Sequence, residues 1–170
     1  MRPGVYRNNS VLPDRNPMKV VTAAQMQALD QRTIREAGVP GLTLMERAGS
    51  GVVHAMEETW GGLAGKVITI FCGKGNNGGD GFVVARLLRR KRAKVLLCLL
   101  AKTADLKGDA KSMYQRYIKT AGQAGMVSCP SETRMQKVLE KSHLIVDALL
   151  GTGISSSVKD EFRIAIQLMN

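Results

Sequence analysis

The stretch "NNGGD" at residues 76–80 combines two amides, two glycines and a carboxylate between an apolar run and a segment with helical periodicity. Backbone N–H groups at such a strand-to-helix junction favour an anion such as phosphate. Amide and carboxylate oxygens also suit a hard cation. We interpret the stretch as a polar ligand pocket in which Asp80, near a helix N-terminus, stays ionised. The alternative is a turn in which Asn77 or Asp80 caps the helix, because Asn and Asp favour caps and turns.

The same loop fits the pattern G-x-G-x-x-G, from Gly73 to Gly78, which is typical of dinucleotide-binding loops. That pattern requires an acidic residue about 20 positions later, at the end of the second strand, to bind the ribose hydroxyls. The first acid after the second strand is Asp105, well beyond the end of that strand. A plain NAD-dependent oxidoreductase is therefore the function that the sequence favours least.

Asp147 is a carboxylate within the apolar, strand-like run "HLIVDALLG". A buried carboxylate is costly unless it is paired or bound to a metal. The Gly-Thr-Gly that follows indicates the carboxyl edge of the sheet, where ligands bind in open α/β sheets. We therefore expect Asn77 and Asp147 to converge on one site. The alternative is that neighbouring backbone N–H groups satisfy the carboxylate.

Strand-like and helix-like segments alternate along the chain, which predicts a doubly wound α/β sheet. The expected strands are residues 66–72, 93–100, 125–129 and 143–151. The expected helices are residues 22–37, 43–60, 81–91, 105–121, 131–141 and 158–169. Two helices precede the first strand, and possible capping boxes begin at Thr22 and at Thr43.

A net charge of +11 favours anionic partners, and six basic residues lie in residues 86–94. Leu87, Leu88 and Val95 interleave with them at core spacing, so we interpret this segment as the solvated end of a helix. Nucleic acid is therefore not the expected partner.

The three cysteines, Cys72, Cys98 and Cys129, lie on or beside apolar runs without a C-x-x-C motif. Buried thiols in a reducing compartment are expected, rather than disulfides or a zinc site. No run is long enough to span a membrane, and the first 17 residues lack the apolar stretch of a signal peptide. We expect residues 1–17 to be a flexible extension, residues 18–170 to form the domain, and the protein to be cytoplasmic.

Four segments together resemble the YjeF N-terminal domain family, the NAD(P)H-hydrate epimerases: "VVTAAQMQALD", "GVPGLTLMERAG", "GKGNNGGDGFVVARLL" and "VDALLGTGI". The resemblance covers nearly everything from Met18 onward. It implies a three-layer α/β/α sandwich with a Rossmann-like, mostly parallel sheet, usually in a homodimer. It also implies interconversion of the R and S epimers at C6 of hydrated NADH or NADPH (NADHX and NADPHX). A stereospecific, ADP- or ATP-dependent dehydratase then restores the cofactor, and in bacteria it is often fused to the epimerase.

The resemblance also implies which residues form the site. A potassium ion would be held with the help of Asn77 and Asp147. Our hypothesis is that Asp147 or Asp80, with the ion, positions the attacking water or shuttles the proton, and the sequence does not choose between them. The residues implied to contact the hydrate are Asn76, Asn77, Gly78, Gly79 and Asp80. The residues implied to close around the phosphates are Gly151, Thr152, Gly153, Ile154, Ser155, Ser156 and Ser157.

The chain departs from the family pattern in two ways. The family continues through another strand that ends in an Asp-x-Pro-Ser-Gly-like motif, whereas this chain stops at Asn170. We therefore expect the C-terminal strands to be missing, which could impair the activity. The segment "ISSSV" also lacks a basic residue, which predicts weaker phosphate affinity unless the serine hydroxyls and backbone N–H groups compensate. A non-catalytic nucleotide- or RNA-binding scaffold is the alternative function, and the intact "NNGGD" and Asp147 speak against it.

Overall fold

The computed structural model describes residues 20–170 except 124, 128–130, 155–156 and 159. The predicted flexible extension, Cys129 and two predicted phosphate-binding residues, Ser155 and Ser156, lie outside the described residues.

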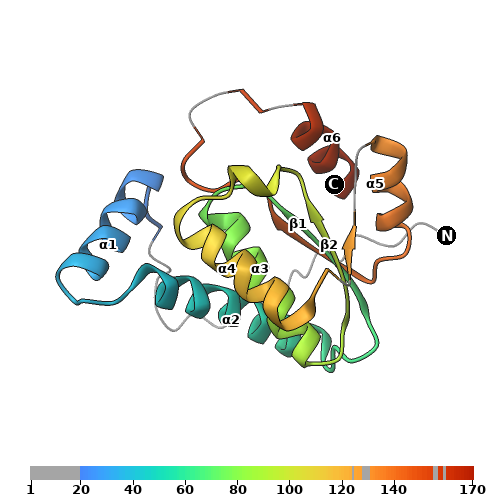
Figure 1. The fold of residues 1–170 in the computed structure, drawn as a ribbon, viewed down its shortest axis with the longest axis horizontal. Coiled ribbons are helices and arrows are strands. Elements are labelled where there is room, and N and C mark those ends of the chain that lie inside the picture. Colours follow the sequence, from blue (N-terminus) through green and yellow to red (C-terminus); the bar gives the residue numbers. More distant parts are fainter. Residues whose placement is uncertain (1–19, 124, 128–130, 155–156, 159) are drawn as a thin grey trace.

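A parallel sheet runs through the middle of the described chain, with its four strands in the order β3-β2-β1-β4 (Figure 1). The strands are β1 (Val67–Cys72), β2 (Lys94–Leu99), β3 (Met126–Val127) and β4 (Leu144–Ala148). Each strand lies inside a segment that the apolar pattern predicts, which confirms the α/β class. Parallel pairing requires a crossover between consecutive strands, and the helices supply it.

Helices cover both faces of the sheet, which confirms the three-layer sandwich. Two hydrophobic clusters lie on opposite faces: one joins the sheet to α2, α3 and α4, and the other joins it to α5 and α6. Two helices precede the first strand, as predicted. The helices are α1 (Ala23–Arg35), α2 (Gly41–Trp60), α3 (Asn76–Arg90), α4 (Gly108–Ala121), α5 (Glu132–Leu139) and α6 (Asp160–Met169), with a 3-10 turn at Thr103–Asp105.

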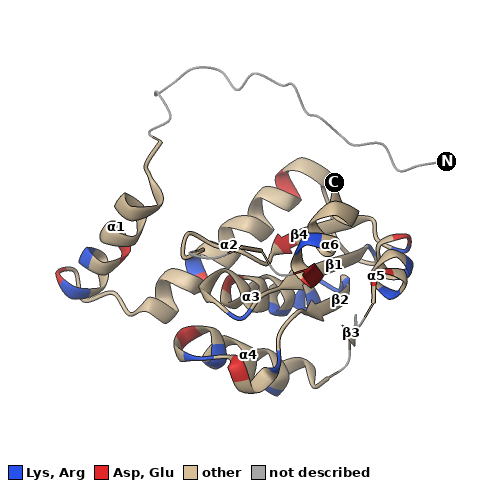
Figure 2. Cartoon of the chain, turned by 90° about the horizontal axis from the view of Figure 1, so that it is seen from above, with Lys and Arg blue, Asp and Glu red and all other residues tan. Residues whose placement is uncertain are grey.

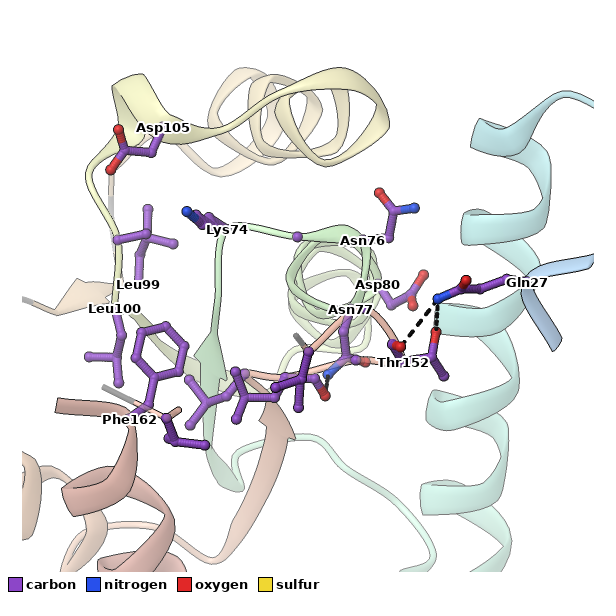
Figure 3. Close-up of a pocket in the computed structure, with 18 of the residues that line it drawn as sticks. Gln27, Lys74, Asn76, Asn77, Asp80, Leu99, Leu100, Asp105, Thr152 and Phe162 are labelled. Atoms are coloured by element: carbon purple, nitrogen blue, oxygen red, sulfur yellow. Dashed lines mark hydrogen bonds between the residues drawn. The ribbon is translucent and has the colours of Figure 1, made fainter. Parts of the chain in front are cut away.

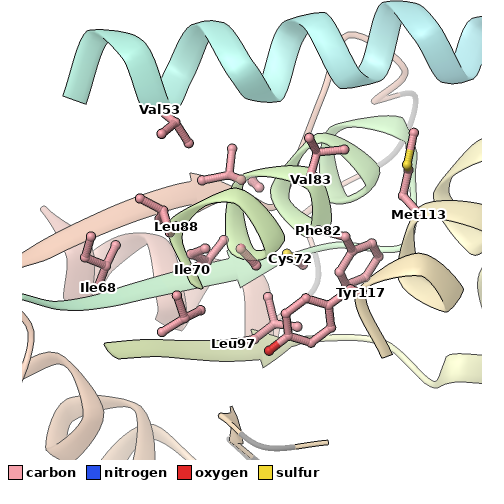
Figure 4. Close-up of a cluster of buried hydrophobic side chains, with 14 of the residues drawn as sticks. Val53, Ile68, Ile70, Cys72, Phe82, Val83, Leu88, Leu97, Met113 and Tyr117 are labelled. Atoms are coloured by element: carbon pink, nitrogen blue, oxygen red, sulfur yellow. The ribbon is translucent and has the colours of Figure 1, made fainter. Parts of the chain in front are cut away.

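Strand β1 is the centre of the core, because it pairs with β2 on one side and with β4 on the other. Ile68, Ile70 and Cys72 belong to the cluster with α2, α3 and α4. The side chain of Phe71 points to the opposite face and packs in the cluster with α5 and α6. Figure 4 shows side chains of the first cluster, among them Ile68, Ile70, Phe82 and Tyr117. Burying a large aliphatic or aromatic side chain contributes about 1.5–3 kcal/mol to the free energy of folding. The buried side chains of β1 therefore fix the position of the loop that follows the strand.

The first predicted capping box is confirmed and the second is wrong. Thr22 caps α1 and exchanges hydrogen bonds with Gln25. Helix α2 instead begins at Gly41 after Pro40, so Thr43 lies inside the helix. Glu46 serves another purpose, since it pairs with Arg86 of α3 and, at 3.2 Å, with Arg116 of α4.

The basic segment at residues 86–94 ends helix α3, as expected for a solvated helix end. Arg86 pairs with Glu46, and Lys91 pairs with Glu57 at 2.8 Å. Lys and Arg are spread over several helices (Figure 2). Two cysteines, Cys72 and Cys98, are buried and form no disulfide, and burial raises the pKa of the Cys72 thiol. None of the helices in the described part of the chain is long and apolar enough to cross a membrane.

Candidate functional site

A cleft of about 1220 Å³ opens at the carboxyl ends of the strands (Figure 3). Its walls come from α1, from the start of α3 and from the segments that follow β1, β2 and β4. This is the sheet edge at which open α/β folds bind ligands. The cleft therefore lies at the carboxyl edge of the sheet, where the sequence analysis predicted the glycine loop and a ligand site.

Glycines after β1 let the chain pass close to the segment after β4. A Cβ on Gly73 would collide with the carbonyl oxygen of Leu149, and the Gly73 N–H donates to the carbonyl of Ala148 at 3.0 Å. A Cβ on Gly78 would in turn collide with the backbone of Gly73. Gly79 packs against Met45 of α2 in the same way. These contacts require glycine for lack of space, not for an unusual backbone conformation.

The structure gives the two central glycines an internal position. Gly78 and Gly79 are buried, and neither lines the cleft. Their predicted contact with a ligand stays a prediction. The two glycines pack closely against Gly73 and Met45. Asn77 and Asp80, the residues on either side of them, lie at the cleft wall.

The "NNGGD" stretch forms the first turns of α3 and is not a capped turn before it. The helix begins at Asn76, five residues earlier than the expected start at Gly81, and its N-cap is Gly75. Neither Asn77 nor Asp80 caps the helix. Asn77 instead donates its Nδ2 hydrogen to the carbonyl of Leu150 at 3.0 Å, which ties α3 to the segment after β4. Asn76 is exposed at the cleft.

Asp80 is partly buried and lines the cleft. Burial, together with the negative charge of Asp30 on α1, raises the pKa of its carboxyl group to about 6. The expectation of a fully ionised Asp80 needs correction, because this carboxyl group exchanges its proton near neutral pH. Asp80 is the fifth residue of α3, beyond the first turn in which the helix dipole favours an anion.

Asp147 is exposed, so the predicted burial is wrong. Among the described strands, β4 pairs only with β1 and is therefore an edge strand. Ile145, two residues before Asp147 and thus on the same face of the strand, is exposed as well. The Asp147 carboxylate accepts the N–H of Leu149 at 2.9 Å, which is the backbone arrangement weighed as the alternative. Asp147 does not line the cleft with Asn77. No group of three or more His, Cys, Asp or Glu side chains suited to a metal occurs within the described part of the chain.

The segment after β4 lines the cleft, in agreement with its predicted place. Of the residues implied to close around phosphates, Gly151, Thr152, Gly153, Ile154 and Ser157 lie at the cleft wall. Together with Asn77 and Asp80, they form a continuous surface from α3 to the end of β4. The structure thus brings the two predicted sequence motifs together.

Sequence reasoning missed the contribution of α1 and of the segment after β2. Helix α1 supplies Gln27 and Asp30 to the cleft, and Lys74 and Lys102 add positive charge. Gln27 donates its amide hydrogens to Thr152, at 3.2 Å from the carbonyl oxygen and 3.4 Å from the hydroxyl. These two residues are 125 positions apart, so no local pattern connects them. The polar residues at positions 27, 30 and 31 of an otherwise amphipathic helix were the available signal.

Comparison with known proteins agrees with this geometry. A family profile described as "YjeF-related protein N-terminus" matches residues 41–170. The chain is 40% identical to a "Bifunctional NAD(P)H-hydrate repair enzyme Nnr" from Moorella thermoacetica, over 90% of this chain and 29% of that protein. It is 37% identical to an "NAD(P)H-hydrate epimerase" from Rhodobacter capsulatus, over 81% of this chain and 64% of that protein. It is 32% identical to an "NAD(P)H-hydrate epimerase" from Rhodopirellula baltica, over 99% of this chain and 68% of that protein.

A solved structure shares the fold. The crystal structure of a yeast protein matches with a TM-score of 0.73 at 23% identity, over 89% of this chain and 65% of the other. The chain thus spans less than two thirds of the first of these relatives and about two thirds of the others. The family profile covers more than half of the chain and includes both motifs that meet at the cleft. The chain belongs to the family of YjeF-related N-terminal domains.

Proposed function

We propose that this chain is an isomerase that interconverts the R and S epimers of NAD(P)H hydrate at C6. The observation that carries the proposal is the meeting of Asn77 and Asp80 with residues 150–154 in one cleft at the carboxyl edge of the sheet. Relatives named NAD(P)H-hydrate epimerase support it. The cleft volume, about 1220 Å³, exceeds the roughly 300–1,000 Å³ of a drug-sized site and suits a dinucleotide.

The chemistry needs a group that can give and take one proton. In the hydrate, C6 carries both a hydroxyl and the ring nitrogen, so nitrogen assists the departure of the hydroxyl. Protonated Asp80 donates its proton to that hydroxyl, which leaves as water. Water then adds to either face of the iminium-like carbon, and the Asp80 carboxylate takes the proton back. A carboxyl group with a pKa of about 6 is suited to both steps near neutral pH.

Asp80 has more support in this role than Asp147. The sequence analysis left both carboxyl groups as candidates for the proton transfer. In the structure Asp80 lines the cleft, whereas Asp147 is exposed and accepts the Leu149 N–H. A general acid must come within hydrogen-bond reach of the group it protonates. We therefore assign the proton transfer to Asp80.

The dinucleotide phosphates would lie between the start of α3 and residues 151–154. The first turn of α3 has backbone N–H groups without partners in the helix, which favours an anion. Lys74 and Lys102 line the cleft and add positive charge. These lysines supply the charge that the segment "ISSSV" lacks, so weak phosphate affinity does not follow from that segment.

A potassium ion fits this site only in part. The amide oxygen of Asn77 is the atom that could coordinate potassium, because the amide nitrogen already donates to the carbonyl of Leu150. Asp147, the other residue implied to hold the ion, does not line the cleft. We keep potassium as a proposal and assign no step of the reaction to it.

The proposed assembly and location also rest on the family. A homodimer is supported by apolar side chains on α1: Met26 and Leu29 are 42% and 48% exposed. Cys72 and Cys98 are buried and form no disulfide, which suits a reducing compartment such as the cytoplasm. Cooperation with a dehydratase is supported by relatives named bifunctional repair enzymes.

An RNA-binding scaffold has less support. The basic stretch that would attract RNA is partly neutralised, because Arg86 pairs with Glu46 and Lys91 pairs with Glu57. The cleft itself carries four carboxylates and two lysines, the reverse of the overall charge: Asp30, Asp80, Asp105, Glu161, Lys74 and Lys102. A cleft of mixed charge does not suit the long, evenly charged backbone of RNA, whereas its two lysines can pair with the diphosphate of a dinucleotide.

The direct test supplies one purified epimer and follows the other by chromatography, with and without potassium. The expected result is a rate above spontaneous epimerisation. A folded protein that leaves the spontaneous rate unchanged would contradict the proposal. RNA binding that falls steeply with salt, with no response to the hydrate, would favour the scaffold instead.

A further inference from the structure

Helix α1 forms one wall of the cleft without being part of the core. None of its residues is buried, and its capping box satisfies its own N-terminus. In Figure 1 it stands to the side of the layers formed by the sheet and the other helices. A wall of this kind needs specific contacts if it is to hold a fixed position.

Gln27 makes such a contact across the cleft. Its side-chain nitrogen lies 3.2 Å from the carbonyl oxygen of Thr152 and 3.4 Å from the Thr152 hydroxyl (Figure 3). On the other side of the same segment, Asn77 donates to the carbonyl of Leu150 at 3.0 Å. The segment after β4 is thus held from α1 and from α3, by one amide side chain each.

The segment has few other restraints. Gly151, Thr152, Gly153 and Ile154 are all exposed. Glycine permits many backbone conformations, so Gly151 and Gly153 leave the position of Thr152 undetermined by local sequence. The hydrogen bonds from Gln27 supply the missing restraint.

We propose that Gln27 is a positioning residue: by binding Thr152 it fixes residues 151–154 in the conformation that receives the phosphates of a dinucleotide. The identity of the ligand rests on the proposed function, whereas the restraint on the segment does not. Gln27 acts on the binding wall and not on Asp80, so it contributes to affinity in the ground state and in the transition state alike. Such a contribution raises KM when it is lost and leaves kcat unchanged.

The test replaces Gln27 by Met, which keeps the length of the side chain and removes the donor. The matched control is Gln31→Met, because Gln31 lines the same cleft from the next turn of α1 and no hydrogen bond of its side chain is found among the described residues. Two quantities are measured for each variant: amide hydrogen exchange in the peptide that covers residues 149–154, and KM and kcat for the hydrate.

In Gln27→Met we expect exchange over this peptide to accelerate about fivefold and KM to rise about five- to tenfold, as for the loss of one or two neutral hydrogen bonds. We expect kcat to stay within about twofold. Gln31→Met should match the wild type in the rate of exchange over this peptide. Unchanged exchange in Gln27→Met, or equal acceleration in both variants, would overturn the restraint. A fall in kcat with KM unchanged would overturn the role in binding.

The two proposals fail separately. If the wild-type protein does not accelerate epimerisation, the proposed function fails, and hydrogen exchange in the two variants still decides the role of Gln27. The dissociation constant for NADH then replaces KM, with the same expected rise in Gln27→Met. An NADH affinity equal to that of the wild type would overturn the role in binding.

Discussion

The wall of the cleft that α3 forms and the wall that α1 forms differ in how they are held. Helix α3 buries eight residues, including Gly78, Gly79 and Phe82, between the sheet and α2 and α4. Helix α1 buries none and contacts residues 151–154 through Gln27. The acid with the raised pKa, Asp80, lies on the first wall. A proton-transfer group needs a fixed position, whereas a binding wall that must admit a ligand gains from lighter restraint.

The largest expected effect is on the packing of the α3 wall. Gly78→Val places side-chain atoms where the backbone of Gly73 lies, and backbone cannot move aside as a flexible side chain can. We expect the free energy of unfolding to fall by about 3 kcal/mol or more, or the protein not to fold. Urea unfolding measures it.

Gly75→Ala is the matched control for that substitution. A Cβ at Gly75 meets no described atom within 4 Å, and its φ of −89° suits any residue. We expect a loss of less than about 1 kcal/mol. Equal stability of Gly78→Val and the wild type would mean that the α3 wall is not rigid.

Asp80→Asn should stabilise the protein at neutral pH while it removes activity. The folded pKa, about 6, lies above the ordinary value of 3.8, so the native state binds the proton more tightly than the unfolded state. The native state therefore loses stability as pH rises through 6, and Asn avoids this loss. We expect a gain on the order of 1–3 kcal/mol at pH 8 and no gain at pH 3.

Unfolding at several pH values checks that sign. A gain from Asp80→Asn that is equal at pH 3 and pH 8 would contradict the raised pKa.

Asp147→Ala should have a modest effect, because this carboxylate is exposed and binds a backbone N–H of its own segment. We expect a loss of about 1 kcal/mol in stability and a smaller loss of activity than Asp80→Asn causes. Epimerisation rates of the two variants under the same conditions decide this. Loss of all activity in a folded Asp147→Ala variant would return the proton transfer, or the ion, to Asp147.

The smallest effect should come from the apolar side chains of α1. Leu29 is 48% exposed, so Leu29→Ala should change stability by less than about 0.5 kcal/mol. Leu88 of α3 is fully buried, and Leu88→Ala should cost about 2–5 kcal/mol. Thermal unfolding of the pair measures the difference between the walls. A large cost for Leu29→Ala would mean that α1 is covered, as it would be by a second copy in a dimer.

The sequence predicted the layers of the fold well, because apolar runs such as residues 66–72 are short, rich in β-branched residues and bounded by glycine. It failed where tertiary packing opposes local preference. The start of α3 was predicted at Gly81, because Asn77 and Asp80 favour turns and caps. In the structure the helix begins at Asn76 and runs through both glycines, where a Cβ would collide with the backbone of Gly73 and with the side chain of Met45.

The sequence predicted the two motifs of the candidate site, but not the exposure of Asp147 or the contribution of α1. The pattern after β1 and the pattern after β4 both indicated the carboxyl edge, and there they meet. The exposure of Asp147 depends on which strands flank β4, which no local pattern records. The contribution of α1 depends on a contact between Gln27 and Thr152, far apart in the chain.

Asp80, on the well-packed wall that α3 forms, is the residue to which we assign the proton transfer in hydrate epimerisation. The most direct measurement compares the wild type and Asp80→Asn for epimerisation of one purified epimer from pH 5 to pH 8, with the spontaneous rate subtracted. We expect kcat/KM of the wild type to decrease above about pH 6, as protonated Asp80 is depleted, and kcat/KM of Asp80→Asn to be about 10²–10⁴-fold lower than that of the wild type. A folded Asp80→Asn variant with wild-type rates across this pH range would contradict it.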